Sequence, residues 1–89
     1  MKEAEVTIVN ELGLHMRAAG RFAKLAGRFR SRVTLMRNGV AVDGKSIVGL
    51  LTLAAAKGSV LVLRADGEDE EDALAALRGI ITERFGEDA

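Results

Sequence analysis

Hydrophobic and polar residues alternate along positions 3–9, where Ala4, Val6 and Ile8 share one face. A period of two is typical of a strand with one buried face, so these positions are predicted to form the first strand. The spacing then changes to that of an amphipathic helix beginning near His15. The apolar positions of this helix are Ala18, Phe22, Leu25, Ala26 and Phe29.

A β-hairpin is predicted next. A second strand begins near Val33 and ends at Asn38 and Gly39, the dipeptide best suited to a type I′ turn because both central residues take positive φ. A third strand, 40–43, must then pair back along the second. The expected cross-strand pairs are Leu35 with Val42 and Arg37 with Val40.

Two further helices and one strand follow the hairpin. Ser46 is placed to cap a short helix, which Lys57 and Gly58 would end with a cation and then a residue that tolerates positive φ. Residues 60–63 (VLVL) are predicted to form a fully buried central strand. The last helix opens with the acidic run at 68–72, whose charges the helix dipole favours. The predicted apolar stripes are Ile47, Leu50, Leu51 and Ala54 on the short helix, and Leu74, Leu77, Ile81 and Phe85 on the last.

The order β-α-β-β-α-β-α predicts an α/β (α+β) fold with the shape of an open-faced sandwich. Helices that are apolar on one side only must all cover one face of the sheet, which leaves the other face to solvent. The 89 residues suffice for one domain, 1–89, with one modest core.

Composition removes several classes of protein and site. The chain has 13 Lys+Arg against 13 Asp+Glu, one His and no Cys, which excludes a disulfide scaffold, a thiolate metal site and a multi-histidine zinc site. A balanced charge lacks the basic footprint of a nucleic-acid binder, and all three Phe fall in helical patterns rather than on the sheet, where bases would stack. The charged first residues are unlike a signal peptide, and no apolar run approaches the roughly 20 residues that span a bilayer. We therefore expect a cytoplasmic chain with no cofactor, no nucleic-acid partner and no membrane partner.

The most informative stretch is 13–19 (GLHMRAA), which places the single His at a strand-to-helix junction, with Arg17 two positions later. Free backbone N–H groups and the positive end of the helix dipole favour an anion at this point, and a guanidinium adds donors for phosphoryl oxygens. A neutral imidazole nitrogen can accept a phosphoryl group near neutral pH. His15 is therefore a candidate phosphoryl acceptor, and a helix cap or a plain surface residue is the alternative interpretation.

No carboxylate at a fixed spacing from His15 is evident to orient the imidazole, and no second catalytic group accompanies it. This argues against a self-contained hydrolase or transferase. We expect a side chain that receives its phosphoryl group from another protein.

Two motifs carry a resemblance to a known family. These are residues 13–19 and residues 44–55 (GKSIVGLLTLAA), the second followed by Lys57 and Gly58 at the predicted helix end. Together they resemble the histidine-containing phosphocarrier protein HPr family of the bacterial phosphoenolpyruvate-dependent phosphotransferase system. The resemblance covers essentially the whole chain. It implies a four-stranded antiparallel sheet covered on one face by three helices, and a monomeric carrier that is not an enzyme in the turnover sense.

The resemblance also implies a route for the phosphoryl group. Phospho-enzyme I would pass it to His15, through Nδ1 in the family, and Arg17 would support its oxygens. An enzyme IIA domain or a regulatory acceptor would then remove it, in sugar transport or, as the alternative, in a nitrogen-type or orphan phosphorelay. Ser46 matches the serine that HPr kinase/phosphorylase modifies in many members. That role is compatible with capping the short helix, because a phosphate at a helix N-terminus is favourable.

Partner-binding positions of the family match residues of the first two helices, namely Met16, Gly20, Ile47, Val48 and Leu51. Met16 and Val48 are expected to be exposed, whereas Ile47 and Leu51 could equally face the core. At Gly20 the missing side chain suits either close approach of a partner or tight packing against the sheet. A basic series could form a rim for acidic partners or a plain solvated face, and its members are Arg21, Lys24 and Arg28.

The chain departs from the family pattern at two positions. Ala18 stands where the motif usually has Pro, which adds a backbone donor near the site and should cost little stability. Met16 is bulkier than the small or hydroxylated residue usual there. Both departures bear on partner specificity.

Overall fold

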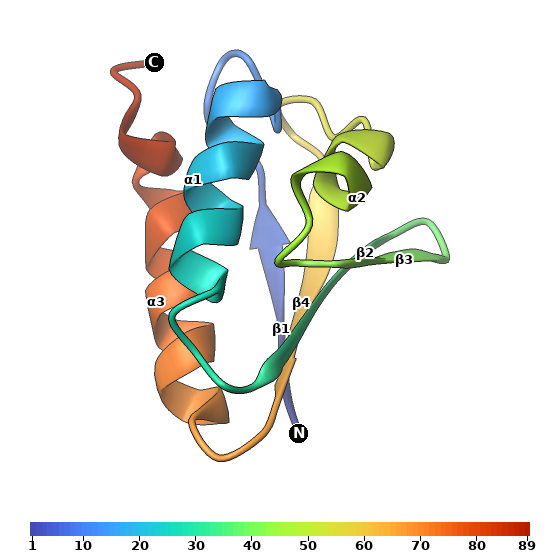
Figure 1. Ribbon diagram of the computed structural model, residues 1–89. Helices are drawn as coiled ribbons and strands as arrows, with labels where there is room; N and C mark the ends of the chain where they lie inside the picture. The colour runs from blue at the N-terminus through green and yellow to red at the C-terminus, as the bar shows by residue number, and fades with distance from the viewer.

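The computed structural model describes residues 1–89 and has the predicted order of elements. These are β1 (Lys2–Thr7), α1 (Met16–Ala26), β2 (Arg32–Arg37), β3 (Val40–Asp43), α2 (Ile47–Thr52), β4 (Val60–Asp66), α3 (Glu70–Thr82) and the 3₁₀ turn η1 (Arg84–Gly86). The strands form one antiparallel sheet in the order β1-β4-β2-β3, and the three α-helices lie on one side of it (Figure 1). None of the helices is long and apolar enough to cross a membrane. The predicted open-faced sandwich is confirmed.

The hairpin of β2 and β3 has the predicted turn and register. Asn38 and Gly39 both have positive φ, at 50° and 83°. The turn determines which residues of β2 and β3 share a face, because a slip of one residue would turn every side chain over. The observed pairs are Leu35 with Val42 and Arg37 with Val40.

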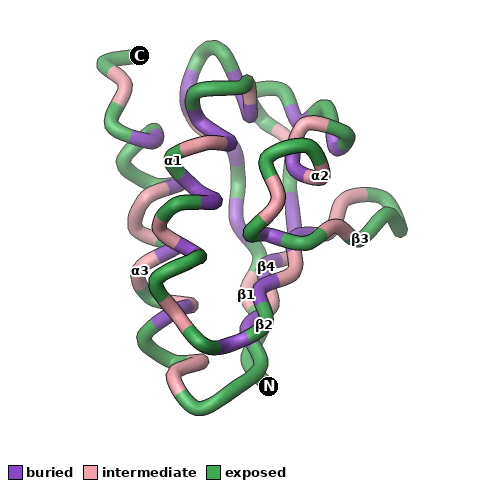
Figure 2. The backbone as a smooth tube through the Cα atoms, in the orientation of Figure 1, coloured by how far each residue is buried: buried purple, intermediate pink, exposed green.

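Strand β4 is central in the sheet but buried on one face only. Leu61, Leu63 and Ala65 are fully covered, whereas Val60 is 54% exposed and Val62 is half-buried. The prediction of a fully buried strand is wrong, because all three helices cover the same face and leave the other to solvent (Figure 2).

Helix α1 contributes the centre of the core. Ala18, Phe22 and Ala26 are fully buried, whereas Leu25 and Phe29, at the edge of the predicted stripe, are half-buried. The core cluster continues through aliphatic side chains of the strands, α2 and α3. Packing therefore fixes the position of α1, and with it the position of the residues at its start.

Helix α2 is shorter than predicted. It ends at Thr52 instead of running on toward Lys57, and Ala54 is exposed with a φ of 49°. Arg37 of β2 donates to the Leu53 carbonyl oxygen at 2.9 Å, which satisfies one of the carbonyl groups left free at the helix end. The predicted stop is wrong because the backbone has already left the helical conformation at Ala54.

Phe85 is buried as predicted, but it does not belong to α3. The helix ends at Thr82, and Arg84, Phe85 and Gly86 have φ values of 58°, 55° and 81°. Left-handed backbone is disfavoured for residues that carry a Cβ. Burial of the Phe85 ring, which is 1% exposed, offsets this cost and holds the turn. The chain is thereby reversed toward α1, which a continuous helix would not allow.

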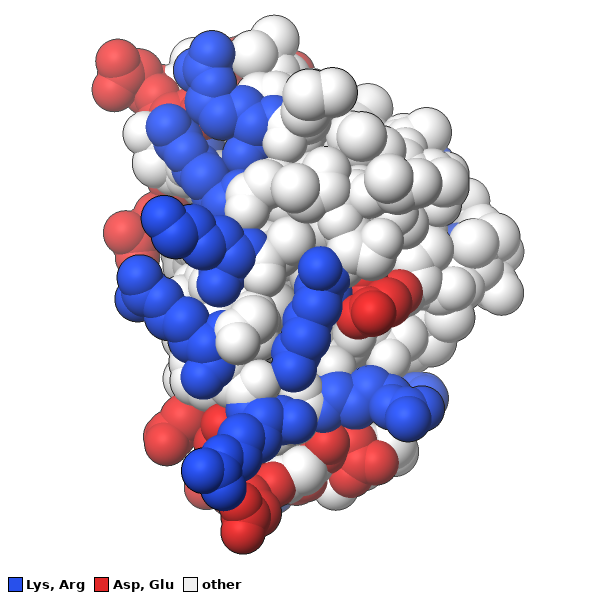
Figure 3. Space-filling view, in the orientation of Figure 1, with Lys and Arg blue, Asp and Glu red and all other residues white.

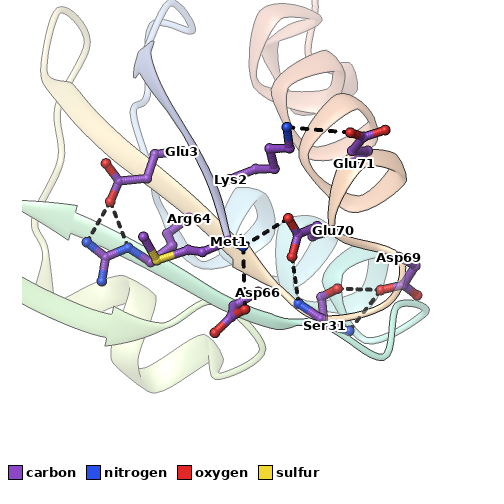
Figure 4. A network of polar contacts seen from close by, with 10 residues as sticks. Met1, Lys2, Glu3, Ser31, Arg64, Asp66, Asp69, Glu70 and Glu71 are labelled. Atoms are coloured by element: carbon purple, nitrogen blue, oxygen red, sulfur yellow. Dashed lines mark hydrogen bonds and ion pairs between the residues drawn. The ribbon is translucent and has the colours of Figure 1, made fainter.

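A polar network joins the N-terminus, the start of β2 and the start of α3 (Figure 4). The Met1 ammonium group lies 3.0 Å from Glu70 Oε2. Asp69 accepts hydrogen bonds from the Ser31 hydroxyl at 2.5 Å and from the Arg30 backbone N–H at 2.8 Å. These hydrogen bonds lower the pKa of Asp69 from its ordinary 3.8 to about 2, and the bond from the Ser31 hydroxyl contributes more than the bond from the Arg30 N–H.

Replacing Asp69 with asparagine should flatten the acid side of the stability curve. A carboxylate whose pKa is lower in the folded than in the unfolded chain stabilises the fold above its ordinary pKa, and this stabilisation is lost as the pH falls toward the folded value. The wild-type chain should therefore lose more stability than Asp69→Asn between about pH 4 and about pH 2. Urea unfolding at several pH values measures this, with Asp72→Asn on the same helix as the control. Equal slopes for the wild type and Asp69→Asn would contradict the prediction.

Candidate functional site

The loop before α1 is held by contacts with the segment that follows α2. Gly13 has a φ of +70°, and a Cβ there would lie 2.6 Å from the Ala55 carbonyl oxygen, so glycine is required. Leu14 is buried, and its N–H donates to the same oxygen at 2.8 Å. These contacts fix the direction in which the chain enters α1 and place His15 at its N-terminus.

His15 caps α1, as one of the two interpretations of the sequence predicted. Its backbone is extended, with φ −83° and ψ −178°, and its Nδ1 accepts a hydrogen bond from the Arg17 backbone N–H at 3.3 Å. The His15 side chain is 27% exposed. No acidic residue lies in the first turn to offset the positive end of the helix dipole. Nδ1 therefore faces the backbone donors of the helix start.

A carboxylate contacts the other nitrogen of the same ring. His15 Nε2 donates to Glu87 Oε2, and Glu87 Oε1 accepts from Asn10 Nδ2 at 2.8 Å. Asn10 is fully buried and also donates to the Gly13 carbonyl oxygen at 2.8 Å. The expectation that no carboxylate orients the imidazole is wrong, because folding brings Glu87 from 72 positions away along the chain.

The pKa of the Glu87 carboxyl lies below its ordinary value. The hydrogen bond from Asn10 has the largest part in this, the His15 ring contributes further, and burial acts in the opposite direction. The Glu87 side chain is only 10% exposed. An ionised carboxylate with two donors is thus held against Nε2.

Residues 83–89, here called the C-terminal segment, bring this carboxylate to the start of α1. Arg21 Nη1 donates to the Phe85 carbonyl oxygen at 2.5 Å, and the Glu11 N–H donates to the carbonyl oxygen of Ala89 at 3.1 Å. Figure 1 shows the C-terminal end of the chain beside the first turn of α1. The segment is therefore tied both to α1 and to the loop that precedes it.

Both the sequence and the fold of this chain match known proteins. The family model described as "PTS HPr component phosphorylation site" matches residues 2–83. The chain belongs to the HPr family. It is 49% identical to the phosphocarrier protein HPr of Cupriavidus necator over 87 residues, which cover 98% of each chain. Like that relative it is a phosphocarrier, and not an enzyme.

Two solved structures of the HPr family from Thermoanaerobacter tengcongensis have the same fold. HPr-C-His matches with a TM-score of 0.96 at 39% sequence identity, over 100% of both chains. The structure named as an HPr dimer has a TM-score of 0.79 at 40% identity, and the match covers 98% of this chain and 100% of that one. The family resemblance seen in the sequence is confirmed.

The residues that the resemblance gives as partner-binding, here called the expected docking positions, lie on α1 and α2, which are in contact with each other. Met16 and Val48 are 70% and 74% exposed, as expected. Ile47 is 42% exposed, whereas Leu51 is half-buried and packs against the core. A Cβ at Gly20 would lie 3.9 Å from Ile47 Cδ1, so Gly20 faces α2 and not the sheet.

A column of cations runs along α1 beside a surface with few charges (Figure 3). Arg21 uses part of its guanidinium to hold the C-terminal segment, so this member of the column also has a structural role. The predicted basic series is a continuous exposed feature next to the expected docking positions. The exposed cations of α1 and of the turn after it are Arg17, Arg21, Lys24 and Arg28.

Ser46 caps α2, as predicted. Its backbone is extended, and its Oγ accepts a hydrogen bond from the Gly49 N–H at 3.1 Å. Ser46 is half-buried, and the next two residues, Ile47 and Val48, are exposed. The Ser46 hydroxyl, which the resemblance gives as a regulatory site, therefore stands at the edge of the expected docking positions.

Proposed function

We propose that residues 1–89 act as one HPr-type domain in which His15 receives a phosphoryl group from phospho-enzyme I and delivers it to enzyme IIA domains or regulatory acceptors. The position of Nδ1 supports this most strongly. It lies at the N-terminus of α1, within reach of the Arg17 backbone N–H. The amides there can donate hydrogen bonds to phosphoryl oxygens, and the exposed guanidinium of Arg17 belongs to the same helical turn.

The transfer is an exchange of one bond for another at phosphorus. The bond between phosphorus and its donor breaks as the lone pair of Nδ1 forms a bond to phosphorus, and the acceptor later reverses this exchange. A carrier must release what it binds, so a few donors at an exposed helix start suit the task better than a closed anion cavity.

Incubation with phosphoenolpyruvate and enzyme I from the same source tests the proposal. Intact mass spectrometry should show one added phosphoryl group, and phosphorus NMR should identify it as an acid-labile phosphohistidine. No label with an enzyme I that is active on another HPr would contradict the proposed function.

Arg17→Ala should slow phosphoryl transfer without abolishing it, because the backbone donors of α1 remain. Loss of a hydrogen bond to a charged group predicts a decrease of about tenfold to a hundredfold in the transfer rate. Rapid-quench measurement of transfer from phospho-enzyme I gives this rate. Arg78→Ala, which removes the same charge from an exposed position of α3, is the matched control and should change the rate much less. An unchanged rate in Arg17→Ala would show that the amides suffice.

Ser46 is proposed as a regulatory site for HPr kinase/phosphorylase. A phosphate in place of the capping hydroxyl can still accept from the first-turn N–H of α2, so the helix should persist. Its charge would stand beside the exposed Ile47 and Val48 and weaken docking of enzyme I. Treatment with the kinase and ATP, followed by the transfer assay, measures both steps. The absence of phosphoserine at position 46 would remove this role.

Donor and acceptor are proposed to dock in turn on the exposed apolar positions of α1 and α2, with the basic column as a rim for acidic partners. Because one surface must serve both, we propose that the carrier acts as a monomer. We also propose that it acts in the cytoplasm. Light scattering of the pure protein tests the monomer. A stable dimer would contradict it; the name of the Thermoanaerobacter tengcongensis structure describes that protein as an HPr dimer.

A further inference from the structure

Glu87 lies five positions beyond the last residue of α3, Thr82, and is held far more firmly than a residue of a free tail would be. Its carboxylate accepts from a fully buried amide, Asn10, on one oxygen and from the His15 ring on the other. The backbone that carries it is anchored by the buried Phe85 ring on one side and by the contact of Ala89 with the loop before α1 on the other. The buried Asn10 amide needs an acceptor at this place, but an amide oxygen would serve it as well as a carboxylate oxygen.

The two neighbours of the His15 ring specify where its proton lies. A carboxylate oxygen can only accept, so the Nε2 that faces Glu87 must carry a hydrogen. The Arg17 backbone N–H can only donate, so the Nδ1 that faces it must offer its lone pair. Both contacts select the same neutral tautomer, with Nε2–H and a free lone pair on Nδ1.

We infer that Glu87 is a positioning residue for phosphoryl transfer, which holds the His15 ring with Nε2–H toward the C-terminal segment and the lone pair of Nδ1 toward the start of α1. This inference rests on the proposed function of His15 as the acceptor. It adds a residue that lies outside the stretch 2–83 matched by the family model.

The same contact also acts on the charge that develops during transfer. As Nδ1 forms its bond to phosphorus, the imidazole ring gains positive charge, and the proton on Nε2 stays in place. The Glu87 carboxylate lies against that proton and stabilises the charged ring. When the acceptor removes the phosphoryl group, the pair of electrons returns to Nδ1 and the ring is neutral again, so no proton has to enter or leave the site.

Two substitutions remove this contact in different ways. Glu87→Ala deletes the carboxylate, and Glu87→Gln keeps its shape but has only one oxygen to accept from both Asn10 and His15. Asp88→Ala is the matched control, since it removes one negative charge from the adjacent, exposed position. Glu87→Asp retains a carboxylate and should recover part of any lost rate.

Nitrogen-15 NMR of the imidazole reads the tautomer directly, without any partner protein. The wild type and Asp88→Ala should show a protonated Nε2 and an unprotonated Nδ1 in the neutral ring. Glu87→Gln and Glu87→Ala should show a larger share of Nδ1–H. Phosphoramidate, a small phosphoryl donor, should label the wild type at Nδ1 alone and Glu87→Ala at both nitrogens.

Transfer from phospho-enzyme I should be about tenfold slower in Glu87→Ala than in Asp88→Ala, as expected for a lost hydrogen bond to a charged group. Backbone amide spectra check that both variants keep the fold, and Glu87→Gln replaces Glu87→Ala if the latter does not. A wild-type protein that takes no phosphoryl group from enzyme I would defeat the proposed function. A wild type that is labelled normally, with Glu87 variants of unchanged tautomer, labelling position and rate, would defeat the positioning role alone.

Discussion

Replacing His15 with alanine is expected to abolish phosphoryl transfer while the sheet and its three helices remain folded. His15 is the single histidine of the chain, so no other imidazole can take its place. The side chain is partly exposed and lies outside the core, and its structural contributions are the cap of α1 and the hydrogen bond to Glu87. Loss of a cap of this kind costs about 1 kcal/mol of stability.

Intact mass spectrometry measures the phosphoryl group that each variant takes from phosphoenolpyruvate and enzyme I. Urea titration of the same variants gives the free energy of unfolding. His15→Asn separates the two roles, because asparagine is a good helix cap but has no imidazole. It should show no transfer and a stability closer to that of the wild type. Retained label in either variant would take His15 out of the mechanism.

Replacing Phe85 with alanine is expected to cause the largest loss of stability among single substitutions in the C-terminal segment, about 3–5 kcal/mol. The ring is 1% exposed and belongs to the core cluster, so its removal leaves a cavity. Burial of the ring also offsets the cost of the left-handed backbone at Arg84 and Phe85, and an alanine side chain would offset less of it. The turn that delivers Glu87 to His15 should then loosen.

Urea unfolding compares Phe85→Ala with Phe29→Ala, a matched truncation of a half-buried ring just beyond α1. The control should lose distinctly less stability. The Phe85 variant should in addition show the altered imidazole tautomer that is expected of the Glu87 variants. Equal losses for the two rings would mean that Phe85 does not anchor the segment.

Features whose causes lie within a few residues could be predicted from the sequence. The positive φ values of Asn38 and Gly39 set the hairpin and its register, and the cap at Ser46 acts on an amide three positions away. The end of α2 could not be predicted in this way, and the Leu53 carbonyl oxygen there accepts from Arg37, a residue of β2 that no local pattern connects with it. The open face of β4 depends likewise on where all the helices lie.

The candidate site likewise combines contacts between neighbouring residues with a contact between residues far apart in the sequence. His15 and Arg17 stand together in one short motif, and both the cap and the donors of the helix start follow from local geometry. Glu87 lies against the ring because α3 packs on the sheet and the chain reverses at Arg84, Phe85 and Gly86. A glycine soon after the last apolar position of a helix is a sign of such a reversal, but it does not say which residue the returning chain will meet.

Because Nδ1 is both the cap of α1 and the proposed acceptor, one backbone amide should report whether His15 carries a phosphoryl group. In the empty carrier the Arg17 N–H donates to Nδ1. Once phosphorus occupies that lone pair, the amide proton must turn to a phosphoryl oxygen or to water, and both its resonance and its rate of exchange with deuterium must change. The fraction of loaded molecules in a working mixture could then be counted at Arg17 alone, without a radioactive label and without stopping the reaction.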